Sequence, residues 1–431
     1  MPTTIRTTVI AAILVIASAS AHAAEPKPMP PSANKGKTGS YQCQTKQKGC
    51  TYYVSVPASY GDDNPAGIHL FFHGNGGHNS AAVFEQWDKH VLKPHNLIGI
   101  NMEFEDDDNR KDTSAKSAAA REAVAQTLAD YKIIPGRGVV ASFEAGGITH
   151  AMFAQECGRG RGPGWPFCHS ALYTSAYPAS PAGLPAMSWF IGCGSVAWLM
   201  ALDRIGADSV AHAIELSQNV PRGGCPDICL KITKGQDNLV SVTDIAASTE
   251  GFARADLAFA PFIYAPDFAE KDLKAIVASA NDLQLGAASA SLTKLAAKPG
   301  LAEEIKAKAD QLSAKISERI GRISVLAKDL AKRDPVLCNF YVPLFVTQCK
   351  GLPSEKELKD ILAATKKDKS FAAGLAASAE LNKMLPNVLM IDDKYPKVPA
   401  QKIPALTAVA GRLTEGSQAA TLAAELILLK E

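Results

Sequence analysis

The sequence carries little net charge and few long hydrophobic runs. Over its 431 residues the formal net charge is only +2, and no sustained basic patch is present. Nucleic-acid binding is therefore not favoured, because proteins that hold a phosphate backbone carry such a patch. Beyond the N-terminus, no apolar run reaches the roughly 18 to 20 residues that a membrane-spanning helix needs. We therefore predict no membrane span.

The N-terminal residues have the three parts of a secretory signal peptide. Arg6 precedes the apolar run Val9 to Ala17, which is too short to span a bilayer, and the small-residue triplet Ala21-His22-Ala23 follows. We predict that residues 1–23 direct export to the periplasm or the medium. Residues 24–40 are rich in Pro, Lys and small residues, so we expect a disordered linker there.

The nine cysteines fall mostly as close neighbours in sequence. In an oxidising compartment such neighbours can form disulfides that tie local loops, which leaves Cys193 unpaired. The neighbouring pairs are Cys43 with Cys50, Cys157 with Cys168, Cys225 with Cys229, and Cys338 with Cys349. On one straight helix the last pair would lie about 16 Å apart, so that bond requires Pro343 to break the segment.

Residues 41–264 alternate short β-branched or aromatic runs with amphipathic stretches. This pattern predicts an α/β domain with a doubly wound, mostly parallel sheet. The expected strands are Tyr52–Val56, Ile68–Phe72, Leu97–Met102, Gly138–Ala141, Ala171–Thr174, Ser188–Cys193 and Ile228–Thr233. The expected helices are Ser117–Tyr131, Gly147–Gln155 and Val196–Leu216.

Residues 265–431 are rich in Ala, Lys and Leu and predict a C-terminal all-α region. Apolar residues at three- and four-residue steps indicate one long helix over Leu301–Lys332, ended by Asp334-Pro335. Ser354 and Glu357 have the spacing of a capping box for the next helix. The region can serve to pack against the first domain or to bind a protein partner.

Two glycine-rich stretches follow predicted strands. His73-Gly74-Asn75-Gly76-Gly77 comes directly after Ile68–Phe72, where its backbone N–H groups can face a developing oxyanion. Ser142-Phe143-Glu144-Ala145-Gly146-Gly147 lies between a strand and a helix, which is the setting of a nucleophile elbow. The candidate oxyanion-hole donors are Gly74, Asn75, Gly76 and Ala145.

On these two stretches, the first region resembles secreted esterases of the α/β-hydrolase fold, particularly the polyhydroxyalkanoate-depolymerase and feruloyl-esterase type. Where that family has G-x-S-x-G-G, the nucleophile position holds Glu144 and the first glycine position holds Ser142. The family's histidine follows the last strand, where Asp237 stands, and all nine histidines here lie at or before His212. The acid position falls at Gly194-Ser195. The resemblance therefore implies a triad substituted at all three positions.

Three functions remain open. The first is a pseudo-hydrolase that keeps the fold for binding or structural work. The second is an ester or glycoside hydrolase that uses Glu144 with the carboxylates of Glu103 and residues 105–108. The third is an envelope interaction protein that acts through residues 265–431. Ser142 is not expected to be the nucleophile, and His78 or His150 would need a partner within hydrogen-bond reach to act as a base.

A loop with two arginines and a tryptophan lies between Cys157 and Cys168. Arg159, Arg161 and Trp165, together with Glu103, are candidates for the rim of a small-molecule site, with an ester or a carbohydrate as ligand. The acidic run after Leu97–Met102 is best explained as a solvated loop. We predict no metal and no cofactor.

Overall fold

The computed structural model describes residues 31–75, 85–106, 108–109, 111–158, 167–173, 187–194, 209–219, 225–235, 240–392 and 395–430. The predicted signal peptide lies outside these residues. Within the predicted linker, Ser32 donates two hydrogen bonds to the Asp130 carboxylate, from its N–H and from its hydroxyl, each 2.6 Å long. This contact ties the described part of the linker to the end of a helix in the first region.

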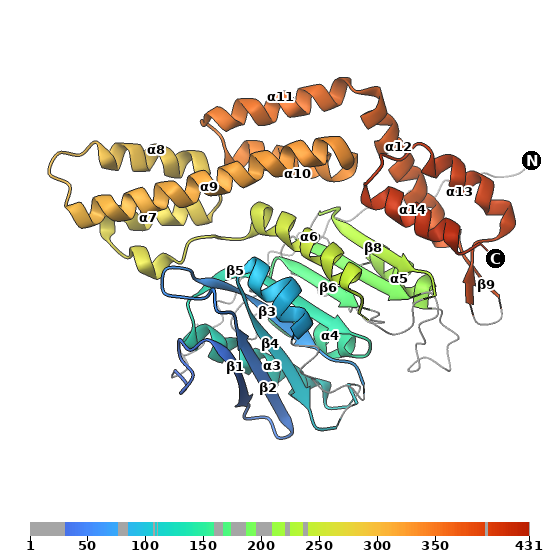
Figure 1. Cartoon of the computed structure of the whole chain (residues 1–431), viewed down its shortest axis with the longest axis horizontal. Helices are drawn as coiled ribbons and strands as arrows, with labels where there is room; N and C mark the ends of the chain where they lie inside the picture. Colours follow the sequence, from blue (N-terminus) through green and yellow to red (C-terminus); the bar gives the residue numbers. More distant parts are fainter. Residues whose placement is uncertain are drawn as a thin grey trace, which may run out of the picture.

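An eight-stranded sheet forms the centre of the first region, in the order β1-β2-β4-β3-β5-β6-β7-β8 (Figure 1). The strands are β1 Gly39–Gln44, β2 Cys50–Val56, β3 Ala66–Phe72, β4 Leu97–Phe104, β5 Ile133–Phe143, β6 His169–Tyr173, β7 Ser188–Gly194 and β8 Ile228–Thr233. The β1–β2 and β2–β4 pairs are antiparallel, and the other neighbouring pairs are parallel. The predicted α/β-hydrolase-type sheet is confirmed.

Helices cover both faces of this sheet, because its central strands are apolar on both sides. On β3, Ile68 and Leu70 pack in the cluster that includes residues of α3 (Thr113–Asp130) and α4 (Gly146–Gly158). Phe71, which points the other way, packs with residues of α6 (Val242–Phe259). The remaining helices of the first region are η1 Asp88–Leu92, α2 Lys93–His95 and α5 Ser209–Asn219. Only residues 209–216 of the predicted helix Val196–Leu216 are described.

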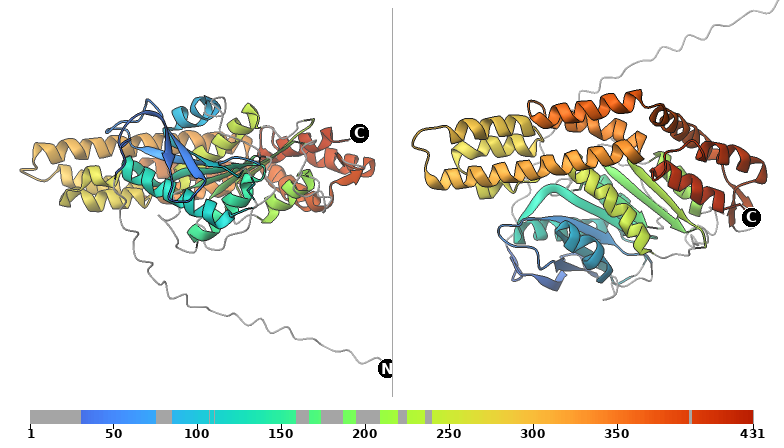
Figure 2. Two further views of the ribbon diagram at one scale, coloured as in Figure 1. Left: turned by 90° about the horizontal axis from the view of Figure 1, so that it is seen from below. Right: turned by 45° about the horizontal axis from the view of Figure 1, so that its top comes forward.

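The C-terminal region is helical, as predicted, apart from one small hairpin. Its long helices arch past α6 and extend beyond the sheet on both sides (Figures 1 and 2). The elements are η3 Ala265–Phe268, α7 Lys271–Asn281, α8 Leu285–Ala296, α9 Glu303–Arg333, α10 Pro335–Gln348, α11 Pro353–Lys367, α12 Lys369–Met384, η4 Leu385–Asn387, β9 Met390–Asp392, β10 Tyr395–Lys397, η5 Ala400–Lys402, α13 Ile403–Ala410 and α14 Gln418–Leu428. Within the described ranges, no helix has the length and apolar character needed to cross a membrane.

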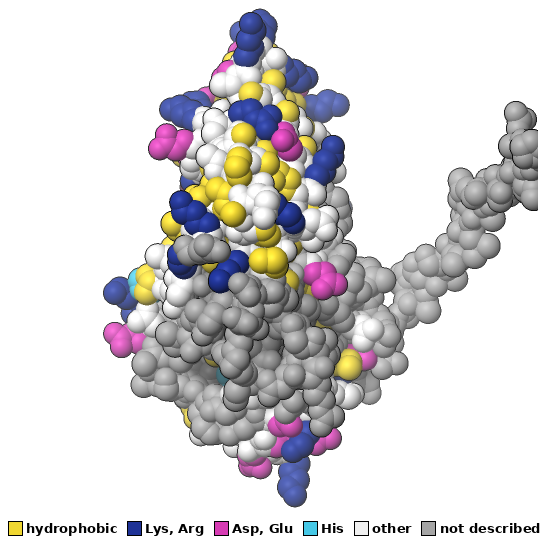
Figure 3. All heavy atoms as spheres, turned by 90° about the vertical axis from the view of Figure 1, so that its right-hand side faces the viewer, with side chains coloured by type: hydrophobic (Ala, Val, Ile, Leu, Met, Phe, Trp, Pro, Cys, Tyr) yellow, Lys and Arg dark blue, Asp and Glu magenta, His cyan; other side chains and the backbone are white. Residues whose placement is uncertain are grey.

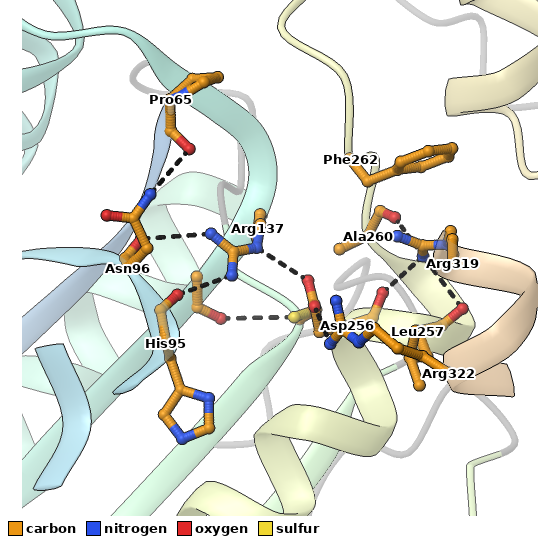
Figure 4. A network of polar contacts seen from close by, with 12 residues as sticks. Pro65, His95, Asn96, Arg137, Asp256, Leu257, Ala260, Phe262, Arg319 and Arg322 are labelled. Carbon is orange, nitrogen blue, oxygen red and sulfur yellow. Dashed lines mark hydrogen bonds and ion pairs between the residues drawn. The ribbon is translucent and has the colours of Figure 1, made fainter. Parts of the chain in front are cut away.

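Arginines fasten the helical region to the first region (Figure 4). Arg319 of α9 is buried, and its Nη2 donates to the carbonyls of Asp256, Leu257 and Ala260 at the end of α6. The Asp256 carboxylate in turn pairs with Arg137 of β5 at 3.1 Å and with Arg322 of α9 at 3.3 Å. Cations at a helix C-terminus stabilise the unpaired carbonyls there. The helical region therefore packs directly on the first region, while a role in binding a partner stays a prediction.

The last strand of the sheet is covered by the last helix. The N–H of Ile232 in β8 donates to the carboxylate of Glu425 in α14 at 2.6 Å. Burial raises the pKa of Glu425 to about 7. An edge strand presents unpaired backbone groups that can recruit another strand, so α14 protects this edge. Leu230 and Leu426 belong to one hydrophobic cluster with residues of both regions, and the predicted boundary after residue 264 stays a prediction.

At the end of the molecule formed by α12–α14, hydrophobic side chains lie among lysines and arginines (Figure 3). Met390 and Leu428 are the most exposed large apolar residues of the described part of this end, at 49% and 54%. Isolated exposed apolar side chains are common on soluble proteins. The exposed Met390 and Leu428 therefore do not indicate a partner-binding surface.

One local prediction is wrong, and another is not supported. The helix expected to begin at a Ser354 capping box begins at Pro353, which fits the first helical turn because its missing N–H is not needed there. The nine cysteines are all free thiols. Cys338 lies on α10, which runs unbroken through Pro343 almost to Cys349, and Cys157 and Cys168 belong to different hydrophobic clusters. The structure shows no disulfide, and the predicted pairings stay predictions.

Candidate functional site

The turn between β5 and α4 has the geometry of an elbow. Glu144 at its apex has a φ of +49°, in the left-handed region that residues with a side chain rarely adopt. Its N–H donates to the carbonyl of Tyr173 at the end of β6, and its own carbonyl accepts from the N–H of Gly147. Such a conformation costs about 1–3 kcal/mol and persists only where the surroundings enforce it. The apex residue therefore has the strained left-handed backbone conformation of a nucleophile elbow, although it is a glutamate and not a serine.

The Glu144 side chain turns toward the loop after β3. The N–H of Asn75, one of the predicted oxyanion-hole donors, donates to Oε2 of Glu144 at 2.9 Å. A Cβ atom added to Gly74 would lie 2.3 Å from that same oxygen. Only glycine at this position leaves room for the carboxylate. The structure therefore brings Glu144, Gly74 and Asn75 together, as the motif predicts.

Glycine is also required just after the apex. A Cβ atom added to Gly146 would lie 2.5 Å from the carbonyl oxygens of both Phe72 and His73. The first turn of α4 therefore rests directly on the backbone that leaves β3. Ala145 is buried between these segments, at 2% exposure. Close packing at Gly146 fixes the distance between the elbow and the donor loop.

Asn109 locks the donor loop in place, and no motif in the sequence identifies it. Its Nδ2 donates to the carbonyl of His73 at 3.0 Å, and its N–H donates to Oδ1 of Asn75 at 2.8 Å. Its Oδ1 accepts from the hydroxyl of Thr149 on α4 at 3.1 Å. Asn109 is 1% exposed. One buried amide thus joins the loop after β3, the loop after β4 and the elbow helix.

Part of the acidic run after β4 forms contacts that stabilise the fold. Lys116 is buried on α3, and its Nζ lies 2.5 Å from the Asp106 carboxylate and 2.7 Å from the carbonyl of Asp108. Asp106 is therefore engaged by a cation. Glu103 pairs in register with Thr51 of β2, and β3 separates its strand from β5. The predicted rim role of Glu103 stays a prediction.

A serine and a histidine do lie together, but inside the core. The Ser142 hydroxyl is 3.1 Å from Nδ1 of His150, whose Nε2 is 3.3 Å from the hydroxyl of Ser170. Ser142 and Ser170 are fully buried and His150 is 3% exposed. Burial lowers the pKa of His150 to about 3, so the ring is neutral at ordinary pH. A substrate has no access to this pair, which supports a packing role for it.

Several predicted site residues lie outside the described residues. These are Gly76, Arg159, Arg161, Trp165, Asp237, His78 and Ser195. The substitution at the histidine and acid positions and the arginine-containing rim therefore stay predictions. The elbow apex and the donor loop are the parts of the site that the structure describes.

No protein-family model matches the chain, and no curated protein sequence matches it. Solved structures do match, over about half of the chain. Dienelactone hydrolase from Anabaena variabilis ATCC 29413 is 13% identical, over 49% of this chain and 95% of that one, with a TM-score of 0.36. Est1E from Butyrivibrio proteoclasticus is 9% identical, over 49% and 97%, with a TM-score of 0.36. LpqC, poly(3-hydroxybutyrate) depolymerase from Bordetella parapertussis, is 16% identical, over 52% and 90%, with a TM-score of 0.37. The fold is assigned from the strand order and elbow of this chain, and these matches carry no argument about its activity.

Proposed function

We propose that this protein is an exported pseudo-hydrolase, in which an α/β-hydrolase fold serves binding or structural work without ester hydrolysis. The observation that carries the proposal is the hydrogen bond from the Asn75 N–H to the Glu144 carboxylate, 2.9 Å long. In an acyl-transfer enzyme this N–H would stabilise the oxyanion of the reacting substrate. Here the Glu144 side chain of the protein itself accepts the hydrogen bond from this N–H.

A Glu144 carboxylate at the Asn75 N–H is electrostatically unfavourable for ester hydrolysis. A tetrahedral intermediate carries negative charge on the oxygen that enters the oxyanion hole. With the Glu144 carboxylate already hydrogen-bonded to Asn75, a second anion would meet a like charge at short range. Two like charges at this distance repel each other. The side chain that replaces the nucleophile therefore also opposes the transition state.

The alternative of a carboxylate-based hydrolase receives less support. It needs an ionised carboxylate near Glu144 to act as its partner. Asp106 is held by Lys116 at 2.5 Å, and Glu103 lies on a strand that does not neighbour β5. Asp106 thus has another role, and Glu103 lies on a strand away from the elbow. A small ester or carbohydrate stays our proposal for a ligand of this site.

Hydrolysis of p-nitrophenyl acetate and p-nitrophenyl butyrate tests the proposal. We expect no turnover above the buffer rate by the purified protein, and the same result for Glu144→Gln, whose amide oxygen can still accept from Asn75. A double variant, Glu144→Ser with Asp237→His, is the matched attempt to restore the family's residues. Wild-type turnover that disappears in Glu144→Gln would overturn the proposal and make Glu144 a catalytic residue.

A further inference from the structure

An open groove of about 580 Å³ lies between α6 and α9 (Figure 1). Leu257 of α6 and Leu326 of α9 contribute apolar side chains to its lining. Val325, which also lines it, is 69% exposed, more than any other large apolar residue of the described ranges. A single exposed valine needs no partner. Here, however, the valine continues into an apolar groove, and a groove of this kind is typical of a surface that receives a helix.

Charged residues flank the apolar pair Val325–Leu326 symmetrically along α9. Arg322 lies three residues before this pair, and Asp329 lies three residues after it. Glu318 lies seven residues before the pair, and Arg333 lies seven residues after it. At about 100° per residue, all of these positions fall within an arc of about 100° around the helix, and they span about 22 Å of its length. They therefore form one continuous face of α9.

The order of the charges makes this face complementary to itself. From residue 318 to residue 333 the four charges alternate as negative, positive, negative and positive, with the apolar pair at the centre. A two-fold axis between residues 325 and 326 would bring each residue to the one at equal distance beyond the axis on a second, antiparallel α9. Arg322 then faces Asp329 of the second copy, and Glu318 faces Arg333 of the second copy. Each contact occurs twice, so four pairs of opposite charge surround the apolar centre.

The four charged side chains are accessible for such contacts. Those of Arg322, Asp329 and Arg333 are 48%, 42% and 40% exposed. Glu318 is also exposed, and none of the described residues forms an ion pair with it. Arg333 pairs with Asp329 on its own helix at 2.6 Å, and Arg322 pairs with Asp256 at 3.3 Å. Exposed ion pairs contribute little to stability, so these side chains can change partners, and Asp256 keeps its ion pair with β5.

We propose that this face of α9, with the groove beside it, binds a second copy of this chain in a symmetric dimer. The pair Val325–Leu326 of each copy packs against the same pair of the other copy, and the charge pairs fix the antiparallel register. Packed helices lie about 8–10 Å apart, so α9 of the second copy also reaches the side of the groove that α6 supplies. A partner of another sequence would need the same order of charges, which α9 itself already carries.

Sedimentation velocity of the full chain, at concentrations up to about 100 μM, tests for a dimer of micromolar affinity. We expect a monomer–dimer equilibrium for the wild type. Arg322→Asp should weaken the dimer at least tenfold, because the new carboxylate faces Asp329 of the second copy twice in each dimer. Asp329→Arg should weaken it as much, because the new guanidinium faces Arg322. Lys306→Asp makes the same charge change as Arg322→Asp at an exposed position near the start of α9, and this control should dimerise like the wild type.

A mixture of the two variants distinguishes this register from any other contact. In a mixed dimer, the carboxylate introduced by Arg322→Asp faces the guanidinium introduced by Asp329→Arg, and the two native side chains face each other. Each variant should therefore stay largely monomeric alone, while the equimolar mixture forms a heterodimer, which native mass spectrometry identifies. A wild type that is monomeric at every concentration would overturn the proposal and leave the groove to a different protein. A wild-type dimer that both variants keep, or a mixture that stays monomeric, would equally contradict it.

Discussion

Replacement of Gly146 by alanine is expected to destabilise the protein by about 2–3 kcal/mol, the upper range for adding a methyl group to a well-packed site. The new Cβ would lie 2.5 Å from the carbonyl oxygens of Phe72 and His73. Both neighbours are backbone atoms at the end of a central strand, so they cannot move aside as a flexible side chain can. The elbow and the donor loop must separate, and the Asn75–Glu144 hydrogen bond should weaken with them. Urea denaturation followed by circular dichroism measures the loss.

Gly321→Ala is the matched control for that substitution. Gly321 lies within α9, and a Cβ atom there would meet no heavy atom within 4 Å. Alanine is the better helix former, so this variant should gain about 0.5–1 kcal/mol. If Gly146→Ala were as stable as the wild type, the close contact between α4 and the β3 loop would be refuted.

Asp227→Asn is expected to cost about 3–5 kcal/mol, the range for breaking a buried ion pair from one side. Asp227 is fully buried and accepts from Arg254, from the hydroxyl of Tyr341 at 2.7 Å and from Nε2 of Gln418 at 2.9 Å. The asparagine would remove the charge that neutralises the buried Arg254 guanidinium, whose other ion pair among the described residues is with Glu250, 3.8 Å away and 59% exposed. Thermal and urea unfolding measure the effect.

The charge on Asp227 also predicts a pH dependence. Burial by itself would raise the pKa of Asp227, but Arg254, Tyr341 and Gln418 together hold it below its usual value. The group therefore stabilises the fold fully above about pH 4, the ordinary carboxyl range, and this stabilisation is lost as the pH falls through the folded-state pKa. Asp227→Asn should lack this acid-dependent component. The double variant Asp227→Asn with Arg254→Met should recover part of the stability, and a purely additive loss would contradict the pairing.

Much of the sheet is predictable from local sequence because its central strands are continuous apolar runs. Every predicted strand overlaps an observed one, and the long helix is found at Glu303–Arg333. The strand β1 was not predicted. Its residues Gly39–Gln44 are mostly polar and mostly exposed, so backbone pairing with β2 rather than a hydrophobic pattern defines it. Sequence spacing likewise could not show that Cys157 and Cys168 pack in different clusters.

The candidate site was predictable only where it forms a local motif. Glycines and a strand-to-helix transition mark Glu144 and the donor loop, but the contact between Asn75 and Glu144 joins residues 69 positions apart. Asn109 reaches partners 34 and 40 positions away. Asp227 likewise accepts hydrogen bonds from Tyr341 and Gln418, which are 114 and 191 positions away. Such contacts depend on tertiary packing, which a periodic pattern does not encode.

Rescue by acetate tests most directly whether the Glu144 carboxylate occupies the donor loop. Glu144→Ala removes two carbon atoms and the carboxylate oxygens beyond Cβ, and acetate has the same atoms. We expect acetate to raise the melting temperature of Glu144→Ala in a saturable manner, because the freed Asn75 N–H can bind it. Acetamide should have a weaker effect, and neither should change the wild type, in which the site is filled. Equal shifts by acetate in the wild type and in Glu144→Ala would contradict the account.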